Sequence, residues 1–299
     1  MSALALRNCT LLDCTGAEPA PRSTVLVADG RIAAVTRGGE PALPRGATAI
    51  DCAGRTLMPG LTDAHVHAAI VETDPGAARR DAPATLALRI KDVLEQTLDA
   101  GFTTVRDTGG ADWGMRDSIA MGLLPGPRLF IAGRAIGPTG GHSDARRRTD
   151  YGAACRCCNA MNFCLEISDG ADAVRKAVRE QLRQGVDQIK IMVSGGVASP
   201  YDPLDSRQFS LDAIGAAVEE AEAFGRYVQA HAYTPEAITR AVGKGVRTIE
   251  HGNLIDDKTA KLMKQKGAYL VANLVAYYAM KERAKEFGMT PEMLAKNDL

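Results

Sequence analysis

Two histidines, His65 and His67, are separated by a single residue in a segment rich in β-formers. Side chains two residues apart on a β-strand point to the same face, so both imidazoles can bind one metal ion. Asp63 would share that face and could orient the histidines from behind. The pair alone is a weak signal, because two histidines can flank a buried valine without any metal. His231 and His251 follow later β-like segments, and together the four histidines predict a metal site.

Lys190 interrupts the apolar run IKIMV, where burial of an unpaired ammonium group is energetically costly. In one interpretation, a carboxylate in the core pairs with this lysine. In the other, the amine is desolvated and neutral, and it reacts with carbon dioxide to form a carbamate. A carbamate carries two oxygens and could bridge two metal ions. Buried lysines have lowered pKa values, which makes the second chemistry feasible.

The elements that must position these side chains begin near residue 57, where short β-branched runs alternate with helical stretches. We predict strands near residues 61–67, 102–109, 128–134, 188–195, 227–232, 248–252 and 268–277. Helical patterns are predicted at residues 82–100, 172–185, 211–225, 235–245 and 256–267, with a helix-like tail at 291–299. This alternation predicts βαβ units and a parallel sheet.

Residues 57–299 therefore predict an α/β fold of the (β/α)8 TIM-type barrel class. Eight strands close such a barrel, whereas the sequence contains seven, so we expect a barrel truncated before its eighth strand. A doubly wound open sheet would tolerate seven strands, but no glycine-rich phosphate-binding pattern follows the first one. The carboxyl ends of barrel strands meet at one face. The predicted ligands lie at or near those ends, as does Asp107, and His142 lies in the glycine-rich loop GPTGGHSD.

Residues 1–56 have a different pattern, in which short β-rich pieces alternate with glycine and proline turns. The tripeptide ADG followed by RIAAV predicts a β-hairpin. We expect this segment to form a small β-sheet domain of its own.

The chain is electrically balanced, with 36 Lys and Arg residues and 36 Asp and Glu residues. This balance, with only 5% aromatic residues, argues against nucleic-acid and membrane partners. No apolar run approaches the roughly 20 residues of a membrane span, and the N-terminus lacks a secretory signal, so we predict a cytoplasmic protein. Four clustered cysteines have a spacing that is unusual for structural zinc, which favours a surface loop with reduced thiols. They are Cys155, Cys157, Cys158 and Cys164.

Five segments in this order resemble the amidohydrolase superfamily: MPGLTDAHVH, GFTTVRDTGG, IKIMVSGGV, HAYTPEA and IEHGNLID. More narrowly, they are similar to its imidazolonepropionase-related branch. That branch includes zinc-dependent prolidase-like and carboxypeptidase-like enzymes that act on dipeptides and N-acyl amino acids. The resemblance covers nearly the whole chain. It implies hydrolysis of an amide bond in a small-molecule substrate by a water that two zinc ions activate.

The resemblance also implies roles for individual residues. The zinc ligands would be His65 and His67 for the first ion, His231 and His251 for the second, and carbamylated Lys190 as the bridge. His142 and Tyr233 would lie near the substrate's carboxylate or scissile carbonyl. Asp63 and Asp107 would support the zinc ligands without binding the metal themselves.

The family's aspartate at the end of the eighth strand, which ligates the first metal and acts as general base, has no counterpart here. Asp256 and Asp257 begin a predicted helix, and Asp298 follows no strand. We therefore expect a truncated version of a longer protein, with the general base unassigned. Two alternatives stay open: hydrolysis or deamination of a cyclic amide or heterocycle, and an inactive paralogue that acts as an interaction or structural protein. Unpaired strand edges would favour a homo-oligomer.

Overall fold

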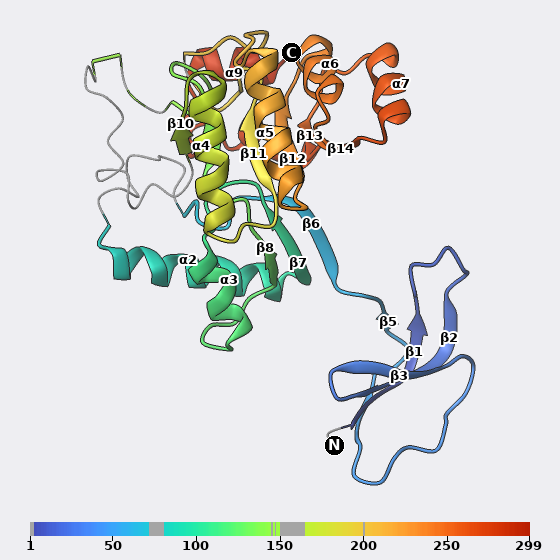
Figure 1. The fold of residues 1–299 in the computed structure, drawn as a ribbon. Helices are drawn as coiled ribbons and strands as arrows, with labels where there is room; N and C mark the ends of the chain where they lie inside the picture. Colours follow the sequence, from blue (N-terminus) through green and yellow to red (C-terminus); the bar gives the residue numbers. More distant parts are fainter. Residues whose placement is uncertain (1–2, 72–80, 145, 147, 150–164, 200) are drawn as a thin grey trace. The chain divides into compact units, whose positions relative to one another are not determined.

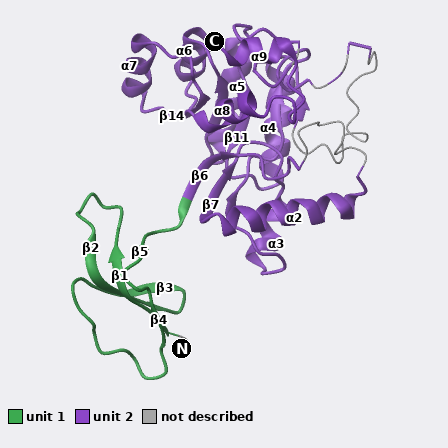
Figure 2. Ribbon diagram, turned by 180° about the vertical axis from the view of Figure 1, so that it is seen from behind, with its two compact units in different colours: residues 1–61 green, residues 62–299 purple. Residues whose placement is uncertain are grey.

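The structure is a computed structural model that describes residues 3–71, 81–144, 146, 148–149, 165–199 and 201–299. The chain divides into two compact units, Met1–Leu61 and Thr62–Leu299 (Figure 2). The sequence placed this boundary slightly earlier, after residue 56. The four clustered cysteines, Cys155, Cys157, Cys158 and Cys164, lie outside the described residues. None of the helices in the described ranges is long and apolar enough to cross a membrane.

The first unit is a five-stranded sheet. Its strands are β1 (Ala3–Leu11), β2 (Ala20–Ala28), β3 (Arg31–Thr36), β4 (Thr48–Asp51) and β5 (Thr56–Leu57). β2 and β3 form the predicted antiparallel hairpin. Asp29 and Gly30 turn it with φ angles of 51° and 72°, the left-handed values that a two-residue type I′ turn requires. Cys9, Leu11 and Val25 form the small buried core.

The second unit is built on parallel strands. They are β6 (Leu61–Val66), β7 (Phe102–Asp107), β8 (Arg128–Phe130), β9 (Ala135–Gly137), β10 (Leu165–Ile167), β11 (Ile189–Met192), β12 (Val228–Ala232), β13 (Thr248–His251) and β14 (Tyr269–Val271). They form one sheet in the order β6-β7-β8 and another in the order β10-β9-β11-β12-β13-β14. β7 and β8 pair in parallel, and so does every pair of neighbouring strands in the sheet that runs from β10 to β14.

Helices follow most of these strands. They are α2 (Pro83–Asp99), α3 (Trp113–Ala120), α4 (Gly170–Arg183), α5 (Leu211–Ala223), α6 (Pro235–Gly243), α7 (Asp257–Lys266), α8 (Leu274–Glu282) and α9 (Pro291–Asn297). Figure 1 shows α4 and α5 side by side against the sheet that holds β11 and β12. Their apolar faces and the outward faces of the strands form one continuous core. Parallel strands with helices between them fit a TIM-type barrel.

Helix starts follow the capping residues of the sequence. Ser210, Thr234 and Asp256 each accept a hydrogen bond from the backbone amide three residues later, at the starts of α5, α6 and α7. Gly267 ends α7 in the left-handed conformation, at a φ of 67°. Asp256 is thus a helix cap, as its place in the sequence predicted.

Two parts of the strand prediction were wrong. The predicted strand at 268–277 ends at Val271, and α8 begins at Leu274, because Asn273 turns the chain with a φ of 33° and a ψ of 54°. The predicted strand at 128–134 stops at Phe130, and after Gly133, with a φ of 66°, β9 begins. Both segments are apolar, as the predicted strands required, but a turn of the backbone interrupts each of them. The helices α3 and α8 were not predicted.

Candidate metal-binding active site

Four imidazoles meet at the carboxyl ends of the parallel strands of the second unit. His65 belongs to β6, His231 to β12 and His251 to β13, and His67 follows β6 directly. The ring centroids are 5.4 Å apart for His65 and His67, 4.8 Å for His65 and His251, and 4.6 Å for His231 and His251. The structure therefore brings all four histidines together.

Lys190 lies within β11, and its register partner on β12 is Gln229, two residues before His231. Only 1% of its surface is exposed. Burial lowers the pKa of Lys190 to about 8, an effect that Glu250 opposes and Arg106 reinforces. Neither a hydrogen bond nor an ion pair engages the Lys190 amine within the described ranges of the chain.

Burial lowers the pKa of every histidine in this cluster. The pKa of His67 falls to about 4, and those of His65, His231 and His251 fall well below the usual value. The positive charge of Lys190 adds to each of these shifts. The imidazoles are consequently neutral at pH 7, which is the form that binds metal ions.

His65 is oriented by a buried ion-pair network. Its Nδ1 lies 2.8 Å from Oε2 of Glu250, which leaves Nε2 free. Glu250 is fully buried and accepts two hydrogen bonds from Nη2 of Arg106, at 2.7 and 2.8 Å. The hydroxyl of Thr248 donates a third bond of 2.8 Å. A carboxylate behind a histidine is a common means of fixing a metal ligand.

Sequence reasoning missed Glu250 and Arg106. The signal that was available is their position: each is a charged residue inside a short β-strand, next to a residue that was singled out. Arg106 precedes Asp107, and Glu250 precedes His251. Charged residues inside a buried strand require partners, so the sequence indicated that each of the two needs a buried partner.

Main-chain carbonyls fix the tautomers of two other histidines. Nδ1 of His67 lies 2.7 Å from the Gly109 carbonyl, and Nε2 of His231 lies 2.9 Å from the Gly195 carbonyl. A carbonyl can only accept, so each of these nitrogens carries the proton and the opposite nitrogen is unprotonated. The unprotonated Nε2 of His67 lies 3.3 Å from the Thr108 hydroxyl. His251 differs, because its Nδ1 lies 2.7 Å from the hydroxyl of Tyr277 and its φ is 74°.

Asp63 and Asp107 bind main-chain amides of the described chain. Asp63 accepts a 2.9 Å hydrogen bond from the backbone amide of His65. Asp107 is fully buried and accepts bonds from the amides of Ala68, Gly109 and Ala111, at 2.8, 2.9 and 3.1 Å. Burial raises the pKa of Asp107 to about 6. Both carboxylates hold the backbone that carries the histidines, and neither forms a hydrogen bond to an imidazole among the described contacts.

His142 and Tyr233 line the same cluster. The His142 ring stacks on His231 with centroids 4.2 Å apart, and the Tyr233 ring lies parallel to His251 at 5.2 Å. The Tyr233 hydroxyl lies 2.7 Å from the hydroxyl of Tyr277, on α8. Tyr277 was missed because its segment was expected to end a strand.

The donor set fits divalent ions. Four neutral imidazoles are chemically suited to such ions. Among the residues that the structure describes, no three His, Cys, Asp or Glu side chains already stand in a metal-ligand arrangement.

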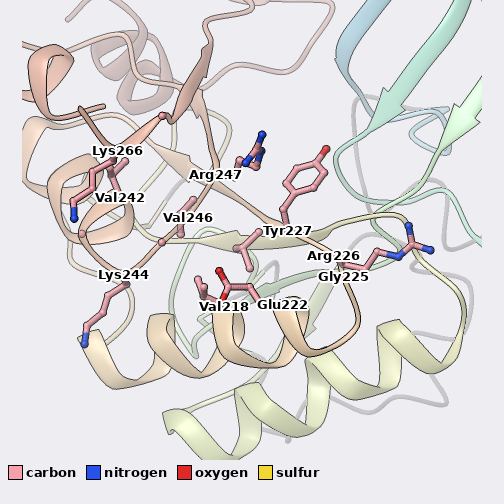
Figure 3. A pocket seen from close by; sticks show the side chains of 14 residues that line it. Val218, Glu222, Gly225, Arg226, Tyr227, Val242, Lys244, Val246, Arg247 and Lys266 are labelled. Atoms are coloured by element: carbon pink, nitrogen blue, oxygen red, sulfur yellow. The ribbon is translucent and has the colours of Figure 1, made fainter. Parts of the chain in front are cut away.

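A cavity of about 630 Å³ lies at the opposite, amino-terminal ends of β12, β13 and β14 (Figure 3). It is lined by Tyr227, Arg247 and the residues where α6 and α7 end. None of the predicted site residues lines it. In barrel enzymes this end of the strands serves stability and the other end serves chemistry, so the cavity does not mark the active site.

Residues 56–298 match the family model of the Amidohydrolase family. The chain belongs to this family. The match confirms the resemblance drawn from the sequence. The amidohydrolase fold also appears in the structural comparison: a solved prolidase in complex with N-methylphosphonate-L-proline is 44% identical, with a TM-score of 0.94. That similarity covers 99% of this chain and 72% of the solved one.

Two further relatives are an ochratoxinase and a dipeptidase. The ochratoxinase of Aspergillus niger is 31% identical over 276 residues, which is 85% of this chain. A solved Xaa-Pro dipeptidase with bound methionine is 29% identical, with a TM-score of 0.83, over 99% of this chain and 73% of that one. This amidohydrolase chain spans about half the length of the curated relatives it matches, 55% for the ochratoxinase.

Proposed function

We propose that this chain forms the metal site of an amidohydrolase that cleaves the amide bond of a dipeptide or an N-acyl amino acid. His65 and His67 would hold one zinc ion, and His231 and His251 a second. The observation that carries the proposal is the meeting of four neutral imidazoles around a buried lysine at the carboxyl ends of the strands.

The burial of Lys190 supports its conversion to a carbamate that bridges the two ions. A buried ammonium group without a partner is costly. In the reaction, the nitrogen lone pair of the neutral amine bonds to the carbon of carbon dioxide, and the nitrogen releases a proton. The cation thereby becomes an anion with two oxygens, which would be available as metal ligands.

The bound ions would supply Lewis-acid activation of the attacking water and of the amide carbonyl. The chain's own residues position the ligands and the substrate. Glu250 holds His65, and the Gly109 and Gly195 carbonyls hold His67 and His231 in the tautomers that leave the opposite nitrogen unprotonated.

We assign Tyr233 as a hydrogen-bond donor to the substrate. Burial raises its pKa to about 12, so the hydroxyl keeps its proton at neutral pH. Such a donor can hold a carboxylate or an oxyanion beside the histidines. His142, stacked on His231, would bind the same end of the substrate. Glu250 and Asp107 are each held by several donors, so we assign neither of them as the proton acceptor.

The substrate class is supported by the relatives. A prolidase at 44% identity and a Xaa-Pro dipeptidase at 29% identity carry names that refer to dipeptide substrates. A panel of Xaa-Pro dipeptides, other dipeptides and N-acyl amino acids, run beside cyclic imides, tests the proposal. Turnover of cyclic imides alone would replace it with the hydrolysis of cyclic amides.

The metal site is tested by zinc analysis of the full chain expressed with zinc and bicarbonate. We expect about two zinc ions per chain, as in other two-metal hydrolases. Lys190→Ala should lose most of the zinc and the activity, whereas Lys176→Ala, at an exposed position on α4, should keep both. A fully active and zinc-loaded Lys190→Ala protein would overturn the assignment.

A further inference from the structure

The ammonium group of Lys296 is surrounded by three main-chain carbonyls. Lys296 lies near the end of α9, and its Nζ donates hydrogen bonds to the carbonyls of Gly196, Ser199 and Asp202, at 3.0, 2.6 and 2.7 Å. All three carbonyls belong to the connection between β11 and α5. Hydrogen bonds from a charged donor are about twice as strong as neutral ones, so this contact ties α9 firmly to that connection.

The same connection contacts two histidines of the cluster. The Gly195 carbonyl fixes His231, and the hydroxyl of Ser199 lies 2.7 Å from Nδ1 of His142. Gly196 lies directly against the His142 ring, because a Cβ added there would be only 2.1 Å from Cε1 of the ring. Whatever fixes these backbone atoms also fixes the two rings.

Asp202 links the lysine to the backbone of His142. Its carbonyl accepts from Lys296, and its carboxylate accepts from the Gly196 amide at 3.0 Å and from Nε2 of Gln208 at 3.1 Å. The other end of the Gln208 amide accepts a 2.8 Å bond from the His142 main chain. Asp202 is 4% exposed, so these bonds are protected from water. A continuous set of hydrogen bonds thus joins Lys296 to His142.

We propose that Lys296 is a positioning residue for substrate binding: through Gly196, Ser199 and Asp202 it holds His142 in place. This rests on the proposed function, in which His142 binds the carboxylate or carbonyl end of the substrate. The direct path runs from Lys296 to His142. Of the four imidazoles assigned to zinc, His231 also contacts this connection, but through the Gly195 carbonyl, which is not one of the three carbonyls that Lys296 binds. Loss of the ammonium group therefore weakens substrate binding more than it weakens the chemical step.

The test compares Lys296→Met with Lys281→Met in the full chain. Methionine keeps the length of the side chain and removes the charge. Lys281 is the matched control, because it lies on the neighbouring helix α8 and, among the described residues, pairs with exposed Asp298. Four measurements are made on each protein: the kinetics on the best substrate of the panel, which give KM and kcat, the zinc content, the melting temperature, and hydrogen–deuterium exchange of the peptide that covers residues 194–208.

For Lys296→Met we expect KM to rise about tenfold or more, with kcat within about threefold of the parent. Zinc content should stay constant, and exchange in the 194–208 peptide should become faster. Lys281→Met should match the parent in all four. An unchanged KM overturns the proposal. So does a parallel loss of zinc, kcat and melting temperature, since that pattern marks a residue needed only for folding.

A failure of the proposed function can be distinguished from a failure of the positioning role of Lys296. If the parent protein hydrolyses nothing in the panel, the proposed function fails, and the exchange measurement alone decides the role of the lysine. Faster exchange confined to residues 194–208 then supports the anchoring role, and unchanged exchange overturns it.

Discussion

Replacement of Glu250 with glutamine should strongly destabilise the second unit. The carboxylate is fully buried, and it accepts both short bonds from Arg106, whose side chain is 12% exposed. Glu250→Gln preserves the shape and can still bond to His65, but it leaves the guanidinium buried without a counter-charge. Removing one partner of a buried ion pair costs roughly 3–5 kcal/mol. For a domain of this size, that loss lowers the melting temperature by roughly 6–20 °C.

The assay is urea unfolding of four proteins: the parent, Glu250→Gln, Arg106→Met and the double variant. We expect the double variant to be more stable than the sum of the two single effects predicts, with a coupling of roughly 1–3 kcal/mol, since no charge is then left alone. Glu219→Gln is the control, because Glu219 pairs with Arg175 at the surface and its side chain is 71% exposed. Its loss should cost roughly 0–1 kcal/mol.

Two results would refute this reasoning. One is a Glu250→Gln protein within about 1 kcal/mol of the parent, which would mean that the pair contributes no more than a surface pair does. The other is strict additivity in the double variant, which would mean that Arg106 and Glu250 stabilise the fold independently. The zinc affinity of Glu250→Gln should also fall, by roughly 10–100-fold, because His65 loses its charged partner.

Two further predictions concern acid and packing. The pKa values of His67 and His142 are about 4 in the folded chain, below the ordinary value of 6.5. Between pH 4 and pH 6.5 both groups are therefore neutral in the folded chain and charged in the unfolded chain. The metal-free protein should therefore lose stability as the pH falls from 6.5 through 4, and a constant urea midpoint over that range would contradict the assigned burial. Gly196→Ala places a methyl group against the His142 ring and should raise KM and cost roughly 1–3 kcal/mol. Gly243→Ala, which meets open space on α6, is the control, and equal effects of the two would count against the close contact.

Much of this molecule could be predicted from local patterns. The histidine pair on β6, the hairpin at Asp29 and Gly30, and the cap at Asp256 each depend on residues close together in the chain. Strand periodicity and capping act over a few residues, so a sequence expresses them directly. The same periodicity placed the histidines at strand ends, and parallel strands then bring those ends to one face.

Other features were decided by the tertiary structure. Arg106 and Glu250 are 144 residues apart, Tyr277 and His251 are 26 apart, and Lys296 and Gly196 are 100 apart. No local pattern says which buried charge meets which, because the partner is chosen by how strands and helices pack in space. The cost of burying a charge alone makes such pairing obligatory, but only the fold specifies the partner. The sequence by itself therefore determined the four histidines and the strands that carry them, while packing decided which residues hold those histidines in place.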